Sequence, residues 1–162
     1  MLTLIATPVG RTDEITLRGL AELQSADVVI CESTKETSKL LKQHNIKAKK
    51  YEVLDEHSTV QDLERLMILC KEQNVVLVSD CGTPGFCDPG NNLIALCRKQ
   101  NVEVKSSLVA SALMGLLSLS SERIYQFQFR GFLSAETEKR EKEWLELKKN
   151  KGVLILMDLA LS

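Results

Sequence analysis

The chain has 162 residues, of which 44% are apolar and 27% charged, and its formal net charge is -1. This length is enough for one domain, or for one domain and part of a second, with a buried core. The composition excludes a disordered or repetitive chain, and the near-neutral charge excludes bulk attraction to nucleic acid. Any affinity for RNA must come from a local patch, a partner subunit or an assembled target.

The apolar runs are too short for a membrane protein. The longest, Leu113 to Leu119 and Val153 to Met157, fall far below the roughly 20 residues that cross a bilayer. No basic segment or cleavage site precedes the first apolar run, so we expect no secretory signal, no membrane partner and a cytoplasmic location. Five cysteines without a CxxC pair and two histidines without ligand spacing predict reduced thiols and no metal site.

Short apolar runs alternate with stretches of helical period, which is typical of β-α units that feed a parallel sheet. In chain order, the pattern predicts a strand at 2–6, a helix at 15–24, a strand at 27–31, a helix at 35–44, a strand at 50–54, a helix at 58–70, a strand at 75–79, a helix at 91–100, a strand at 102–105 and a helix at 110–120. The apolar, largely β-branched run at 75–79 predicts a central strand that is covered on both faces.

Polar residues mark the expected helix starts. Asp13 and Ser33 are the predicted caps of the first two helices, and Ser58 is expected to open the third. Glu36 stands three residues after Ser33, where it would complete a capping box.

From about Ser120 the pattern changes. A half-exposed strand is predicted at 125–133, a charged helix at 135–149 and a further strand at 152–159. We therefore expect an α/β protein with a parallel five-stranded sheet flanked by helices in residues 1–118. Residues 119–162 are expected to be the start of a second, mixed α/β domain, cut or reduced after its last strand.

The loop after the first strand contains Thr7, Pro8 and Gly10. These residues form a stiff turn that lets a ligand or another backbone approach closely. In open α/β sheets, ligands bind beyond the carboxyl ends of the strands, which is where this loop should lie. A plain strand-to-helix turn explains the same residues equally well.

The loop from Ser79 to Gly90 has three glycines and two prolines in twelve residues, whereas about two to six residues suffice for a connection. Gly82 and Gly85 can adopt conformations closed to other residues and expose peptide groups to a flat polar ligand such as an adenosine. An Ω-loop without a ligand is the alternative. No GxGxxG follows the first strand and no GxxxxGK[ST] occurs, which argues against an ordinary dinucleotide fold and a P-loop.

Five segments together carry a resemblance to a known family. TPVGRTDEITLRGL, CESTKETSKLL, EHS at 56–58, SDCGTPGFCDPG and RGFL at 130–133 resemble, in order and spacing, the bacterial small-subunit ribosomal RNA methyltransferase I family, a branch of the tetrapyrrole-methylase superfamily. The resemblance implies a parallel-sheet N-terminal domain, a mixed-sheet C-terminal domain, S-adenosylmethionine in the cleft between them and a homodimer. It also implies 2′-O-methylation of a ribosomal RNA cytidine, with ribosomal RNA or the small subunit as substrate.

The resemblance carries over to individual positions. The cofactor-binding residues it implies are Pro8, Gly10, Asp80, Cys81, Gly82, Thr83, Gly85, Phe86, Ser111 and Ala112. Members of the family hold the cofactor largely through main-chain atoms, in agreement with the argument from glycine.

Glu32, at the carboxyl end of the second strand, is the candidate catalytic carboxylate on the substrate side. It could instead cap a helix or pair with Lys35 or Lys39. His57 is a weaker candidate, since nothing nearby sets its charge and a surface or packing role explains it. Asp88, before Pro89, is interpreted as a helix cap.

The chain departs from the family at several positions. Leu108, Val109 and Ala110 replace the family's PGP, Arg11 replaces an asparagine, Ser33 and Lys35 replace an Asp and an Arg, and 158–162 replace ESPHR. Two other functions therefore stay open: a degenerate relative that serves as an interaction module, and a methylase of a tetrapyrrole or another small metabolite.

Overall fold

A computed structural model of the chain describes residues 1–86, 88–107, 111–121 and 123–157. Its main feature is a five-stranded, all-parallel sheet with the strand order β3-β2-β4-β1-β5. The strands are β1 (Leu2–Ile5), β2 (Val28–Cys31), β3 (Tyr51–Val53), β4 (Val75–Val78) and β5 (Val104–Ser106). β4 lies at the centre and all four of its residues are buried, so the prediction of a covered central strand is confirmed.

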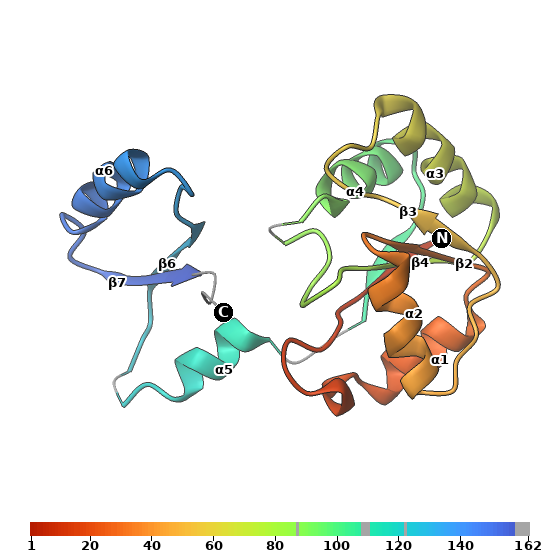
Figure 1. Ribbon diagram of the computed structural model, residues 1–162, viewed down its shortest axis with the longest axis horizontal. Coiled ribbons are helices and arrows are strands. Elements are labelled where there is room, and N and C mark those ends of the chain that lie inside the picture. Colours follow the sequence, from red (N-terminus) through yellow and green to blue (C-terminus); the bar gives the residue numbers. More distant parts are fainter. Residues whose placement is uncertain (87, 108–110, 122, 158–162) are drawn as a thin grey trace. The chain divides into compact units, whose positions relative to one another are not determined.

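Helices cover both faces of this sheet (Figure 1). They are α1 (Leu17–Ser25), α2 (Thr34–Gln43), α3 (Val60–Glu72) and α4 (Gly90–Lys99), with a short 3-10 helix at Thr12–Glu14. Leu23 of α1 and Leu41 of α2 pack with one face of the strands, and Leu66 of α3 and Leu93 of α4 pack with the other. The predicted α/β class with flanking helices is confirmed. Within the described ranges, no helix is long and apolar enough to cross a membrane.

The first helix starts later than the sequence suggests. Asp13, the expected cap, lies in the 3-10 helix and pairs with Arg11 at 2.8 Å. Thr16 caps α1 instead, and its hydroxyl accepts from Gly19 N at 3.0 Å. The prediction was wrong because the chain makes an extra turn before it enters the helix.

A similar shift occurs at α3. Ser58, at which the helix is predicted to open, lies before it; its hydroxyl donates to Asp55 Oδ1 at 3.0 Å and closes the turn that precedes the helix. Thr59 caps α3 and forms a reciprocal capping box with Asp62. The choice between two adjacent hydroxyl residues depends on this turn and not on residue type.

Ser33 caps α2 as predicted, and its hydroxyl accepts from Glu36 N at 3.3 Å. The predicted capping box is wrong, however, because Ser33 N donates to Asp80 Oδ1 at 3.1 Å. A side chain from the loop after β4 thus takes the place of Glu36. This bond ties the loop after β2 to the loop after β4.

The chain forms two compact units, Met1–Met114 and Gly115–Ser162. The division falls within α5 (Ala112–Ser118), whereas the sequence suggested a boundary at the end of that helix. The second unit contains β6 (Phe127–Phe132), α6 (Thr137–Leu147) and β7 (Val153–Met157). β6 and β7 are parallel, with an irregularity between Phe129 and Gly131 where Gly131 has φ 73°.

The edge strand β3 carries a partly enclosed ion-pair cluster. The side chain of Glu52 is only 12% exposed and lies 2.6 Å from Arg65 and 2.8 Å from Lys50. Burial alone would raise the pKa of Glu52, but the hydrogen bonds from Lys50 and Arg65 lower it below the ordinary value of 4.5. Because the folded pKa is the lower one, this stabilisation is present above pH 4.5 and is lost as the pH falls through the folded value.

We expect Glu52→Gln to lower the free energy of unfolding by about 1 kcal/mol at pH 7, and by much less at pH 3. Urea unfolding at the two pH values measures the difference. Glu103→Gln is the matched control, because Glu103 pairs with Lys105 at 3.1 Å but is 62% exposed; its change should stay within about 0.5 kcal/mol. Equal losses at pH 3 and pH 7 would contradict the role given to Glu52.

Candidate functional site

The loops after β1, β2 and β4 meet at the carboxyl edge of the sheet, because these three strands are neighbours and parallel. The first and third of these loops form an antiparallel bridge between Thr7 and Gly82. Thr7 N donates to Gly82 O at 2.8 Å, and Gly82 N donates to Thr7 O at 3.2 Å. Cys81 adds a weak contact from its Sγ to Val9 O at 3.8 Å. The two loops that the sequence singled out are therefore joined backbone to backbone.

Two glycines in the loop after β4 adopt left-handed conformations. Gly82 has φ 89° and Gly85 has φ 79°. Around Gly82 there is space, since the nearest atom to an added Cβ is Val9 Cγ2 at 3.9 Å. Gly85 faces α4 instead, where an added Cβ would lie 2.6 Å from Ile94 Cδ1. The backbone at Gly82 thus leaves room beside its α-carbon for a ligand, although its own N–H and C=O are bonded to Thr7, while Gly85 allows the loop to pack on the helix.

Asp88 closes the far end of this loop. Its Oδ1 accepts hydrogen bonds from Gly85 N and from Gly90 N, the latter at 3.1 Å. The N-cap position of α4 is Pro89 and not Asp88, so the interpretation of Asp88 as the cap is off by one residue, although its carboxylate accepts from the first N–H of the helix. Phe86, which is 50% exposed, lies between these two anchors, and Phe86 N donates to Thr83 O at 3.2 Å.

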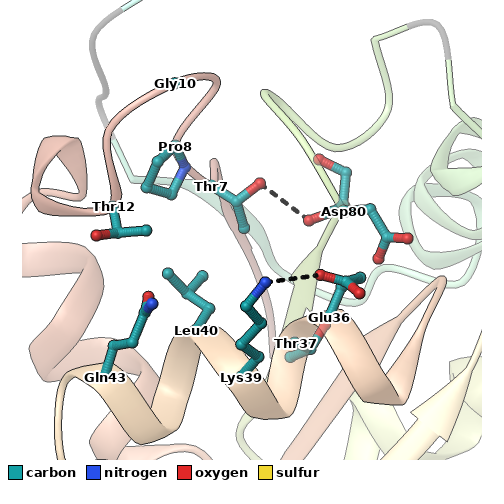
Figure 2. A pocket seen from close by; sticks show the side chains of 11 residues that line it. Thr7, Pro8, Gly10, Thr12, Glu36, Thr37, Lys39, Leu40, Gln43 and Asp80 are labelled. Atoms are coloured by element: carbon teal, nitrogen blue, oxygen red, sulfur yellow. Dashed lines mark hydrogen bonds and ion pairs between the residues drawn. The ribbon is translucent and has the colours of Figure 1, made fainter. Parts of the chain in front are cut away.

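A cavity of about 180 Å³ lies between the loop after β1, the end of β4 and one side of α2 (Figure 2). Its lining includes Pro8, Gly10 and Asp80, all three of which the sequence proposed as cofactor residues. The other lining residues are Thr7, Thr12, Glu36, Thr37, Lys39, Leu40, Gln43 and Ser79. The residues of α2 that line the cavity were not predicted from the sequence, although positions 36, 39, 40 and 43 have the spacing of one helical stripe. Because this stripe mixes apolar and charged residues, its sequence pattern does not differ from that of a solvent-facing side of a helix.

Glu32 lines a second cavity of about 530 Å³ on the other side of the loop after β2. Asp55, Asp88 and Asn92 also line it. Burial raises the pKa of Glu32, and the negative charges of Asp88 and Asp80 raise it further. The pKa of Glu32 therefore lies closer to neutral pH than that of an exposed glutamate, which suits a group that accepts a proton.

The remaining candidates are not among the residues that line these two cavities: they are Cys81, Gly82, Thr83, Gly85 and Phe86 of the loop after β4, together with His57, Ser111 and Ala112. The side chain of His57 is 85% exposed and its Nε2 lies 3.8 Å from Glu56, in agreement with a surface role. Ser111 and Ala112 lie at the start of α5, where Ser111 Oγ accepts from Met114 N at 3.4 Å. The altered positions 108–110 and 158–162 lie outside the described residues, so the role of Ser111 and Ala112 stays a prediction. Within the described ranges, no three histidine, cysteine, aspartate or glutamate side chains are placed to share a metal ion.

The chain is similar to curated and solved proteins along nearly its whole length. It is 37% identical over 160 residues to "Ribosomal RNA small subunit methyltransferase I" of Rickettsia prowazekii (strain Madrid E), covering 98% of this chain and 57% of that protein. Identity to the protein of the same name from Leptospira biflexa serovar Patoc is 33% over 158 residues, covering 98% of this chain and 66% of the relative. The chain therefore spans between half and two thirds of the length of these relatives.

Among solved structures, diphthine synthase is similar with a TM-score of 0.70 and 16% identity, over 99% of this chain and 65% of that one. Uroporphyrin III C-methyl transferase from Thermus thermophilus is similar with a TM-score of 0.59 and 16% identity, over 81% of this chain and 58% of the other. These two likenesses concern the fold. The profile of the family described as Tetrapyrrole (Corrin/Porphyrin) Methylases matches residues 1–161. Because this profile matches nearly the whole chain, the chain belongs to the tetrapyrrole methylase family.

Proposed function

We propose that the chain binds S-adenosylmethionine and forms the cofactor-binding part of a methyltransferase that acts on small-subunit ribosomal RNA. The observation that carries the proposal is the Thr7–Gly82 bridge, which holds two turn-rich loops together at the carboxyl edge of the sheet. The names of the curated relatives support RNA as the substrate. Those relatives are longer than this chain, so the activity of the whole protein is part of the proposal.

The described residues fit such a cofactor. The space beside Gly82 and its left-handed φ leave room for a nucleoside at this turn, and Asp80 adds a carboxylate at the cavity edge. When bound, the cofactor supplies an activated methyl group on a sulfonium. We assign its binding to Pro8, Gly10, Asp80, Cys81, Gly82, Thr83, Gly85, Phe86, Ser111 and Ala112. Gly85 would act through its carbonyl oxygen, since its α-carbon faces Ile94 and its N–H is bonded to Asp88.

Glu32 is the residue we assign to the attacking hydroxyl. Its carboxylate would orient that hydroxyl and accept its proton as the methyl group passes from sulfur to oxygen; the carbon–sulfur bond would break as the carbon–oxygen bond forms, and a neutral thioether would leave. The raised pKa of Glu32 supports this role, because it brings the pKa of the proton acceptor closer to neutral pH. As the finer part of the proposal, the acceptor is the 2′-hydroxyl of a cytidine. A homodimer and a cytoplasmic location complete it, and light scattering tests the dimer.

Calorimetry with S-adenosylmethionine and S-adenosylhomocysteine tests the first step, with adenosine and methionine as matched fragments. We expect saturable binding of both intact ligands and much weaker binding of the fragments. No binding at millimolar ligand would overturn the proposal and favour an interaction module.

Transfer of a labelled methyl group tests the substrate. Naked small-subunit RNA, assembled small subunits and a tetrapyrrole are offered in parallel. Label in RNA, at a nucleotide that resists alkaline cleavage on its 3′ side, is the expected result, because a 2′-O-methyl group blocks that cleavage. Label in the tetrapyrrole alone would contradict RNA as the substrate and favour a small metabolite.

A further inference from the structure

A closed ring of hydrogen bonds surrounds the joint between the loops after β1 and β4. Besides the two backbone bonds between Thr7 and Gly82, the Thr7 hydroxyl donates to Ser79 O at 2.9 Å. The Ser79 hydroxyl in turn donates to Gly82 O at 3.0 Å. Each of the three residues is thus bonded to the other two. Thr7 is 7% exposed and Ser79 is 3% exposed, so water competes little for these groups.

The ring holds the turn from Ser79 to Gly82, which lies in the loop to which the proposed function assigns cofactor binding. Ser79 is the first residue after β4 and Gly82 has the left-handed φ of 89°, so the ring spans the turn in which the chain changes direction. Fixing a flexible backbone residue costs about 1–2 kcal/mol. If the turn is already ordered before the ligand binds, this entropic cost does not reduce the free energy of binding, and the ligand binds more tightly.

Thr7 is the member of the ring that bridges the two loops with its side chain. Ser79 and Gly82 belong to the same loop, so the bond between them is local. The Thr7 hydroxyl adds a side-chain bond from the loop after β1 to the start of the turn, beside the weak contact of Cys81 Sγ with Val9 O. Two backbone bonds remain without it, and we expect the bridge to persist but the turn to loosen.

We infer that Thr7 is a positioning residue for the cofactor: its hydroxyl holds the Ser79–Gly82 turn in the conformation that binds S-adenosylmethionine. The inference rests on the proposed function. It gives Thr7 no contact with the cofactor and no part in the chemistry.

Three variants test the inference. Thr7→Val keeps the shape of the side chain and removes its donor, and Thr7→Ser keeps the donor. Thr3→Val is the matched control, because Thr3 lies in the strand that leads to Thr7, is 1% exposed and has a hydroxyl without a hydrogen-bond partner among the described residues. The readouts are the Kd for S-adenosylhomocysteine by calorimetry and the amide hydrogen exchange of residues 79–83 without ligand.

For Thr7→Val we expect about tenfold weaker binding, the loss expected for one buried hydrogen bond. Amide exchange across the turn should be about tenfold faster. In a methyl-transfer assay the KM for the methyl donor should rise with little change in kcat. Thr7→Ser should bind within about threefold of the wild type, and Thr3→Val should match the wild type in both readouts.

Wild-type affinity in Thr7→Val would overturn the inference while the proposed function stands. The same conclusion follows if Thr7→Ser fails to restore binding, or if Thr3→Val loses as much affinity as Thr7→Val. Absence of binding by the wild-type chain would overturn the proposed function, and the inference with it.

Discussion

Replacing Glu32 by glutamine is expected to lower the rate of methyl transfer by about 10²–10⁴-fold, the usual contribution of a positioned proton acceptor. Glutamine keeps the size of the side chain but accepts no proton at the pH of the assay. Affinity for S-adenosylhomocysteine should not change, since Glu32 lines a different cavity from Pro8 and Gly10. Single-turnover rates and calorimetry on the same preparation separate the two effects.

The pH dependence gives a second test of Glu32. A carboxyl with a raised pKa is more easily protonated in the folded chain, so the wild-type rate should fall with decreasing pH through that raised value. Glu32→Gln should lack this acid limb. Its stability at pH 7 should be equal to that of the wild type or slightly higher, because the ionised carboxylate is disfavoured by burial and by Asp80 and Asp88.

Glu103→Gln is the control for this experiment. Glu103 precedes β5 and so lies at the amino end of a strand, whereas Glu32 follows β2 at the carboxyl end. It should keep the wild-type rate and pH profile. If Glu32→Gln also keeps them, Glu32 is a capping or surface residue and another group accepts the proton.

Replacing Gly85 by alanine is expected to lower the free energy of unfolding by about 1.5–3.5 kcal/mol. Two costs contribute. A side chain at φ 79° is strained by about 1–2 kcal/mol, and the new Cβ would lie 2.6 Å from Ile94 Cδ1, which forces Ile94 out of its rotamer. Chemical denaturation measures the sum.

A double-mutant cycle separates the two costs. Ile94→Val removes Cδ1, so Gly85→Ala should cost less in that background, by about 0.5–1.5 kcal/mol. Gly10→Ala serves as the stability control, because an added Cβ there meets nothing within 4 Å. Equal losses for Gly85→Ala with and without Cδ1 would show that backbone strain alone is responsible.

The order of strands and helices in the first unit could be predicted from the sequence, because each element has its own local pattern. The run at 75–79 shows this well, since a strand buried on both faces must be apolar throughout. Helix starts were less predictable. Asp13 and Ser58 are good capping residues by type, but the turns formed by Arg11 and Asp55 select Thr16 and Thr59 in their place.

The candidate site was predictable as a set of loops but not as a geometry. The glycines and prolines in the loop after β4 signal an unusual turn, yet only the structure separates Gly82, which lies open, from Gly85, which packs on Ile94. The bond between Thr7 and Ser79 joins residues that are 72 positions apart. No local pattern encodes such a contact, because it depends on which strands become neighbours.

The strand order has a consequence for how the protein is made. β1 and β2 follow each other in the chain but do not pair; β4 lies between them and bonds to both. During translation the two early strands therefore have no common partner until residues 75–78 leave the ribosome. Until then their edges are open to chaperones and to other nascent chains, and closure of the sheet is a late, cooperative event.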